Sequence, residues 1–146
     1  MYNVDTMEVG LRALADFASV TGDGKLNVMG VFGEINPPKL PFVLPQMFVV
    51  VVYEASLAEG GLEKESKIVL LDADGNEIIS LEQTIRVPEP KRPGMQIAAN
   101  QIVGLAGLKF EKHGDYQFSF LIDGDEKGTL SLRVNSPDAG GGTSNA

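Results

Sequence analysis

Three side chains that carry oxygen atoms, those of Asp72, Asp74 and Asn76, occupy alternate positions in one short polar segment. Carboxylate and amide oxygens are ligands that calcium prefers, and this spacing is similar to the start of a calcium-binding loop. An EF-hand loop needs its glycine two places after Gly75 and a bidentate glutamate at its end. A tight Asp-Gly-Asn hairpin turn explains the same residues more simply, so we favour the turn.

A second group of aspartates, Asp23, Asp123 and Asp125, also lies in predicted turns. Loops at one end of a β-sandwich can cluster and share a cation, and spacing leaves open whether Asp72, Asp74, Asp123 and Asp125 meet. Aspartate is also common in turns because its side chain hydrogen bonds to nearby backbone. The turn interpretation is therefore preferred for this group too.

His113 is the only histidine, so any histidine-dependent base, triad or polyhistidine site would depend on it alone. It lies in a polar segment, 111–115, that precedes an expected strand, and we interpret it as an exposed turn residue. The serines lack the Gly-x-Ser-x-Gly context of a nucleophile elbow. We therefore expect a protein that is not an enzyme, and we assign no catalytic, cofactor-binding or metal-binding residue.

Asp16 is unusual because it interrupts the apolar run 13–18, where a charge is costly unless it is paired or solvated. It is a candidate site residue. Two structural explanations rank ahead of that role: an ion pair with Arg12 or Lys25, or an outward position on an edge strand, where a charge discourages aggregation.

Composition excludes several classes of function. The 146 residues carry 20 acidic and 12 basic side chains, a net charge of −8, which opposes binding to nucleic acid and to anionic lipid. Cysteine is absent, so disulfides and thiolate chemistry are excluded. We expect no signal peptide in the first 20 residues, because charged side chains interrupt the apolar run there. The longest apolar stretch, Met47–Tyr53, is too short to span a bilayer. We expect a soluble, cytoplasmic protein.

Hydrophobic patterning predicts a single domain over residues 1–135, followed by a disordered Gly/Ser-rich tail over 136–146. A β-hairpin is predicted for residues 11–35, with strands over 11–20 and 25–35 and a turn at 21–24. The second strand has apolar residues on both faces, and we expect both faces to be partly covered. Four prolines within 36–45 predict an extended loop that crosses between two sheets.

The strongest strand is Met47–Leu57, which is β-branched and aromatic and is expected to be central and covered on both faces. Helix is expected only as a short turn near 57–64 or 105–111, and 104–108 is expected to lead around one end of the fold. The other strands are expected at 66–73, 77–87, 95–103, 116–122 and 130–134. The predicted fold is an all-β antiparallel sandwich of about eight strands, immunoglobulin-like or Greek-key.

Several segments together resemble a known family. They are Ala-Asp-Phe-Ala at 15–18, the run 24–32, the Pro37-Pro38 crossing, Gly-Asp-Tyr-Gln-Phe at 114–118 and Ile-Asp-Gly at 122–124. This pattern resembles a family of small uncharacterised bacterial proteins over most of residues 11–135. The resemblance implies a compact β domain and transfers no catalytic residue. The C-terminal hairpin is also similar to those of immunoglobulin-like sandwiches.

The leading functional hypothesis is a non-enzymatic binding or assembly module, with self-association as its simplest form and itself or another protein as partner. Val49–Val52 and Ile68–Leu71 are apolar on both faces, so either would need a partner if one of its faces lay uncovered. The alternative is a domain that binds small ligands or carbohydrates, with calcium at the Asp-rich turns. An enzyme built on Asp16 or a turn aspartate ranks third.

Overall fold

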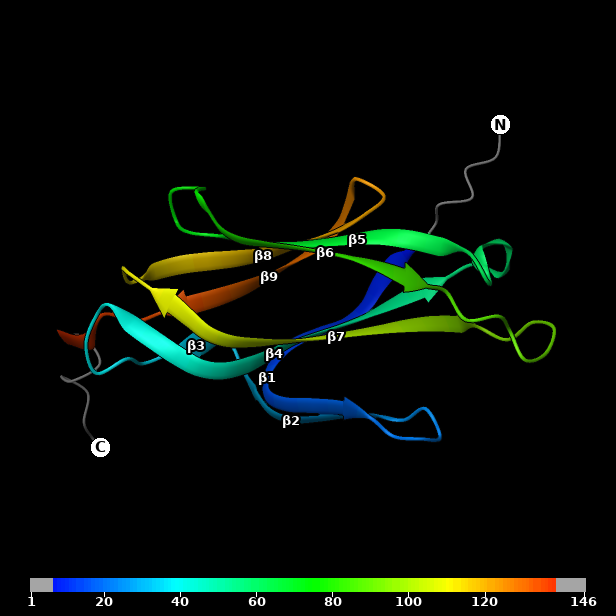
Figure 1. Cartoon of the computed structure of the whole chain (residues 1–146), viewed down its shortest axis with the longest axis horizontal. Coiled ribbons are helices and arrows are strands. Elements are labelled where there is room, and N and C mark those ends of the chain that lie inside the picture. Colours follow the sequence, from blue (N-terminus) through cyan, green and yellow to red (C-terminus); the bar gives the residue numbers. More distant parts are fainter. Residues whose placement is uncertain (1–6, 139–146) are drawn as a thin grey trace.

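Residues 7–138, which are described here from a computed structural model, form two stacked β-sheets (Figure 1). The elements in chain order are β1 (Glu8–Val20), β2 (Leu26–Phe32), β3 (Glu34–Ile35), β4 (Phe42–Ala55), the 3₁₀ turn η1 (Leu57–Glu59), β5 (Glu63–Leu71), β6 (Glu77–Arg86), β7 (Ile97–Phe110), β8 (Gly114–Ile122) and β9 (Asp125–Val134). The all-β sandwich expected from the sequence is confirmed. Of the predicted tail, residues 139–146 lie outside the described residues.

The strand order is β2-β1-β4-β7 in the first sheet and β3-β9-β8-β5-β6 in the second. All neighbouring strands are antiparallel except β3 and β9, which pair in parallel through two residues. In Figure 1 the second sheet forms the upper layer and the first sheet the lower layer. The predicted hairpins at 21–24 and 74–76 are both present, as β1–β2 and β5–β6.

The core lies between the two sheets and follows the period of two that strands impose on side chains. Met47, Val49, Val51 and Tyr53 point inward from β4 and are fully buried. From the second sheet they meet the alternating apolar side chains of β5, β8 and β9, which are Ile68, Leu70, Tyr116, Phe118, Phe120, Ile122, Leu132 and Val134. Burial of this apolar surface is the main stabilising contribution to the fold.

Both of the doubly apolar segments are covered. Val50 points away from the core between Val49 and Val51, and it is nonetheless fully buried, as predicted for a strand covered on both faces. Val69, on the outward face of β5, is almost fully buried as well. Neither Val49–Val52 nor Ile68–Leu71 therefore offers an exposed surface for a partner.

The proline-rich segment crosses between the sheets as predicted, but it is shorter than expected. The chain leaves the second sheet after Ile35 and re-enters the first sheet at Phe42, so Pro45 lies within β4. A proline is tolerated here because β1 pairs with β4 only as far as Phe48, which leaves this part of β4 with a free edge.

The prediction for residues 104–111 was wrong. They neither lead around the end of the fold nor form a helical turn, because β7 continues to Phe110 and pairs with β4 along its whole length. Gly107, with φ of 70°, provides the backbone irregularity opposite Pro45 that lets both strands continue. The short turn predicted near 57–64 is confirmed as the 3₁₀ turn η1, and β5 begins within the same region at Glu63.

Candidate functional site

The β1–β2 hairpin folds back across the outer face of the first sheet. β1 pairs antiparallel with β4, from Glu8 opposite Glu54 to Ala15 opposite Phe48. Over this length β1 therefore runs away from the end of the first sheet at which Ala55 of β4 pairs with Ile97 of β7. The tip of the hairpin nevertheless lies at that end, since residues 23–24 line a pocket of about 300 Å³ together with residues 95–98 and 100. Figure 1 shows the same reversal, in dark blue below β4 and β7.

The reversal occurs at Asp16 and Gly30, which face one another across the hairpin. Gly30 has φ of 70°, and a Cβ atom there would collide with the carboxylate of Asp16. Asp16 is exposed to solvent, which explains how a charge is tolerated inside this apolar run. The ion pair with Arg12 or Lys25, one of the two structural explanations, is absent among the described residues, where Lys25 instead lies 3.7 Å from Asp23.

Large apolar side chains are exposed on and beside this hairpin. Phe17, Met29 and Val31 are 48%, 63% and 65% exposed. Phe17 is the register partner of Met29 and meets Phe48 edge to face, with ring centroids 5.5 Å apart. We call these four side chains, Phe17, Met29, Val31 and Phe48, the hairpin surface. The expectation that both faces of run 25–35 would be partly covered is wrong, because Met29 and Val31 are open to solvent.

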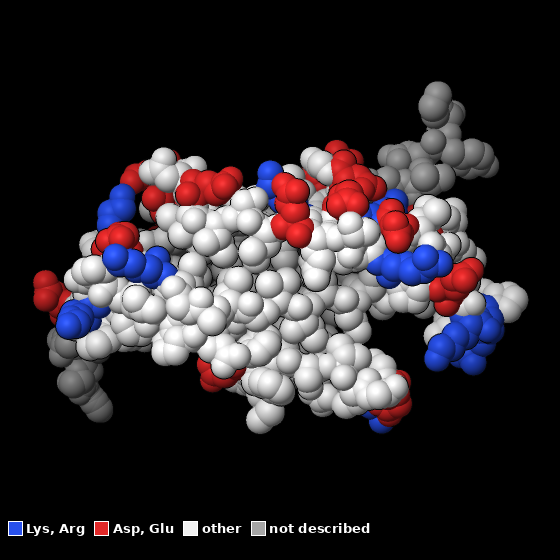
Figure 2. All heavy atoms as spheres, in the orientation of Figure 1, with Lys and Arg blue, Asp and Glu red and all other residues white. Residues whose placement is uncertain are grey.

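The second sheet presents a different outer face. There Lys67 pairs in register with Glu82, and Arg133 forms an ion pair of 3.0 Å with Asp115. In Figure 2 acidic side chains gather along the upper part of the molecule, over the second sheet, whereas the lower part is largely uncharged in this view. The sandwich is therefore polar on one outer side and apolar around the hairpin on the other.

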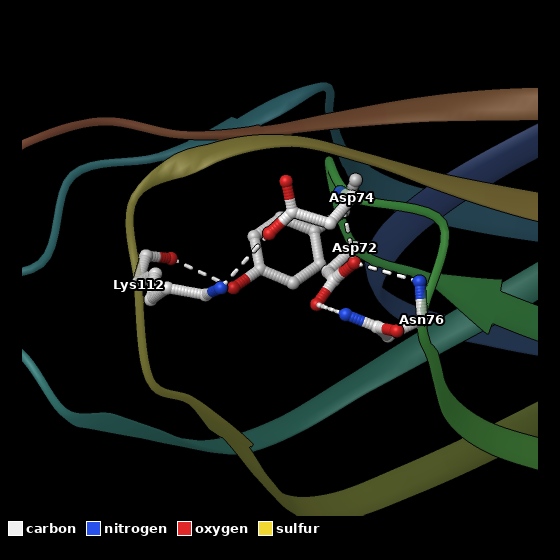
Figure 3. A network of polar contacts seen from close by, with 5 residues as sticks. Asp72, Asp74, Asn76 and Lys112 are labelled. Atoms are coloured by element: carbon white, nitrogen blue, oxygen red, sulfur yellow. Dashed lines mark hydrogen bonds and ion pairs between the residues drawn. The ribbon is translucent and has the colours of Figure 1, made fainter.

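The Asp72 segment is a hairpin turn, as favoured from the sequence (Figure 3). Asp72 Oδ1 accepts hydrogen bonds from the backbone N–H groups of Asp74 (2.9 Å) and Asn76 (2.8 Å). The bond from Asn76 is the main reason that the pKa of Asp72 lies below its ordinary value. Lys112 Nζ donates to Asp74 Oδ2 at 3.1 Å, so this carboxylate is also engaged within the protein.

Asp123 and Asp125 lie at the opposite end of the second sheet. The Asp72 turn follows Leu71, which pairs with Gln117, whereas Asp123 follows Ile122, which pairs with Ser66. The length of β5 separates the two turns by about 20 Å, so the four aspartates do not meet. Among residues 7–138, no group of three or more histidine, cysteine, aspartate or glutamate side chains is arranged to hold a metal ion.

The remaining predicted turn residues are used locally. Asp23 accepts a hydrogen bond from the hydroxyl of Thr21, and this bond is the main cause of its lowered pKa. His113 is exposed in the connection between β7 and β8, as predicted. Asp123, with φ of 50°, accepts a hydrogen bond from the Glu65 N–H at 2.9 Å and so closes the β8–β9 turn against β5.

A buried polar cluster was not anticipated from the sequence. Glu59 and Lys64 are both buried, with 3.3 Å between Glu59 Oε2 and Lys64 Nζ, and Asp123 lies 3.8 Å from the same ammonium group. Glu59 Oε1 also accepts hydrogen bonds from the N–H (2.8 Å) and hydroxyl (3.1 Å) of Ser56. The Ser-x-x-Glu spacing of a capping box was the available signal for the contact between Ser56 and Glu59.

These contacts determine the ionisation of Glu59. Burial acts to raise its pKa, but the two hydrogen bonds from Ser56 and the ammonium of Lys64 oppose burial and bring the pKa below its ordinary value. The carboxylate is therefore charged at neutral pH. Its contacts fix η1 against the start of β5, which is a structural role.

Tyr53 provides a test of how burial in the core affects an ionisable group. Its hydroxyl is buried and makes no hydrogen bond of normal geometry among the described residues. Burial raises its pKa to about 12, and the nearby Ser66 side chain opposes this rise only in part. We expect Tyr53→Phe to be neutral or to stabilise the fold by up to about 1 kcal/mol, because it removes an unsatisfied polar group. Urea unfolding at neutral pH measures this change.

The same residue predicts a loss of stability in alkali. A folded-state pKa raised above the ordinary tyrosine value of 10 stabilises the fold fully below pH 10, and this contribution is lost as the pH rises toward 12. Tyr53→Phe should therefore show a shallower alkaline decline. Tyr116→Phe is the matched control for stability at neutral pH, since its hydroxyl donates to the Lys112 carbonyl at 2.7 Å and its removal should destabilise. A destabilised Tyr53→Phe would contradict the prediction.

Comparisons with known proteins give a family but no activity. No curated protein matches the sequence. Among solved structures, the chain is similar to an immunoglobulin-like protein from Pseudomonas aeruginosa, with 12% sequence identity, a TM-score of 0.45, and coverage of 90% of this chain and 98% of that one. None of the helical segments within residues 7–138 has the length and apolar character needed to cross a membrane.

The expected resemblance to a family of uncharacterised proteins is confirmed, while the bacterial origin stays a prediction. The match extends from residue 11 to residue 135 and so includes nearly all of the sandwich. The chain belongs to the family of unknown function DUF6941.

Proposed function

We propose that this domain is a non-enzymatic binding or assembly module that contacts a protein partner through the hairpin surface. The observation that carries the proposal is the exposure of Phe17, Met29 and Val31 around a β-hairpin in a chain with a net charge of −8. Aromatic residues and methionine are enriched at protein interfaces, where charged residues are depleted from the centre. Exposed apolar side chains that lie together commonly mark such an interaction site.

The way the carboxylates are used supports a role without catalysis. Asp72 accepts hydrogen bonds within its own turn, Asp123 is bonded to β5, and Glu59 is buried against Lys64. Each of these groups stabilises a turn or a connection. The calcium-assisted form of the ligand-binding alternative is disfavoured, because the aspartates that it requires lie at opposite ends of the second sheet. Cytoplasmic location and lack of affinity for nucleic acid remain proposals, supported by composition.

Site-specific photocrosslinking tests the proposal. We expect a benzoylphenylalanine residue in place of Met29 to give discrete protein adducts in cells that produce the chain, because the partner covers this position. Gln117 is the control site, since it is exposed on the outer face of the second sheet. Adducts of the same pattern at both positions, or at neither, would contradict the proposal.

A further inference from the structure

We propose that the partner at the hairpin surface is a second copy of this chain, held by antiparallel pairing of the two β2 strands about a twofold axis. This inference rests on the proposed function and adds the identity of the partner. It would join the two first sheets into one continuous sheet. Met29, which lies on the pairing strand, would then gain apolar neighbours on the same face from the β2 strand of the partner.

The first argument is the state of the β2 edge. β2 pairs with β1 on one side only, and within residues 7–138 no other backbone hydrogen bonds reach it. Natural edge strands are usually guarded by charges, by proline or by a covering segment. The sequence of β2, Leu-Asn-Val-Met-Gly-Val-Phe, has neither charge nor proline. Its one irregularity is the positive φ of Gly30, so residues 26–29 before it keep a regular extended backbone.

The other sheet edges are better protected. β6 carries Glu77, Glu82 and Arg86, and β3 has only two residues. β7 is largely uncharged, but it faces β6 across a pocket of about 330 Å³ lined by residues 81–83 and 101–104. The free part of β4 before Phe48 contains Pro45, which guards that edge. Among the edges of the described sandwich, β2 therefore combines a free backbone, exposed apolar side chains and the absence of both charge and proline.

The second argument is that this edge is complementary to itself. Two identical strands that pair antiparallel obey twofold symmetry, so each supplies the other with backbone donors and acceptors. A second copy offers β2 an uncharged edge flanked by apolar side chains, which matches its own edge. Antiparallel pairing also brings the Lys25 end of one strand to the Glu34 end of the other, whereas parallel pairing would bring like ends together.

The third argument is electrostatic. Each copy carries a net charge of −8, and acidic side chains gather over the second sheet, so two copies repel one another when these faces approach. Contact through β2 places uncharged residues between the copies. Repulsion is therefore weaker in this orientation, which also brings exposed apolar side chains of the two copies together.

Disulfide trapping gives a direct test, because the natural chain contains no cysteine. Asn27→Cys places a single thiol on exposed β2, and Ser80→Cys places one on the exposed edge strand β6 as the matched control. Under mild oxidation we expect a covalent dimer from Asn27→Cys at low protein concentration and little from Ser80→Cys. Equal dimer yields from the two variants would overturn the inference.

Light-scattering mass as a function of concentration completes the test. We expect the natural chain to have twice the monomer mass and Asn27→Lys to be monomeric, because a lysine at the edge opposes pairing. Ser80→Lys should remain dimeric, and circular dichroism should show that both variants are folded. A natural chain that is monomeric at all concentrations would overturn the inference. If the chain is monomeric, photocrosslinked adducts between position 29 and a different protein would still support the proposed function. An absence of adducts at both position 29 and position 117 would contradict the proposed function as well as the dimer.

Discussion

Glu59→Ala is expected to lower the free energy of unfolding by about 3 kcal/mol or more, as is typical when one partner is removed from a buried ion pair. The variant leaves the buried ammonium of Lys64 without the carboxylate that lies 3.3 Å away, and it frees the Ser56 N–H that bonds to Glu59 at 2.8 Å. Urea unfolding at pH 7 measures the loss. Glu63→Ala, at an exposed position on β5, is the matched control and should change stability little.

A double-mutant cycle separates the ion pair from the loss of packing. Lys64→Met keeps most of the aliphatic side chain, so Glu59→Ala combined with Lys64→Met should cost less than the two single changes added together. Strict additivity would show that the two charges do not interact. A loss from Glu59→Ala no larger than that from Glu63→Ala would contradict the structural role given to Glu59.

The same carboxylate sets a direction for acid unfolding. The pKa of Glu59 in the folded protein lies below the ordinary glutamate value of 4.5, so its contribution to stability is present above that pH and is lost as the pH falls through the folded-state pKa. Glu59→Gln cannot titrate, and its stability should therefore fall less steeply in this acidic range than that of the natural chain. If Glu59→Gln and the natural chain lost stability equally steeply as the pH falls, the lowered pKa assigned to Glu59 would be contradicted.

Strand positions followed from sequence where alternation was regular. Tyr116, Phe118 and Phe120 alternate with polar residues, and β8 buries these three side chains as the pattern predicted. The turn at Asp74-Gly75-Asn76 was also recognisable, because its residues tolerate the backbone of a tight turn. Local rules succeed here because each feature depends on residues close together in the chain.

Features that depend on pairing between distant strands could not be predicted in the same way. β7 continues past Gly104 because β4 pairs with it there, whereas the segment 104–108 taken by itself predicted a connection around one end of the fold. Lys64 and Asp123 meet because β5 pairs with β8, a neighbourhood that spacing along the chain does not reveal. The hairpin surface was missed for a related reason: the reversal at Asp16 and Gly30 decides which apolar side chains remain exposed.

Gly30→Ala is expected to destabilise the hairpin by about 2 kcal/mol, because two separate costs arise at this position. The backbone has φ of 70°, a conformation that costs a residue with a Cβ about 1–2 kcal/mol. The new Cβ would also collide with the carboxylate of Asp16, which must then move. Gly33→Ala is the control, since no atom lies within 4 Å of its Cβ position and its φ is not positive.

The double variant Gly30→Ala with Asp16→Gly separates these two costs. Removing the carboxylate relieves the collision but leaves the backbone strain, so about half of the lost stability should return. Hydrogen exchange at β2 should show where the loss falls, with faster exchange over Leu26–Phe32 and little change in β8, which lies in the other sheet. Because the reversal positions Phe17 and Met29, Gly30→Ala should also weaken the proposed dimer. If Gly30→Ala had the same free energy of unfolding as the natural chain and the same hydrogen-exchange rates over β2, the hairpin would not depend on this glycine.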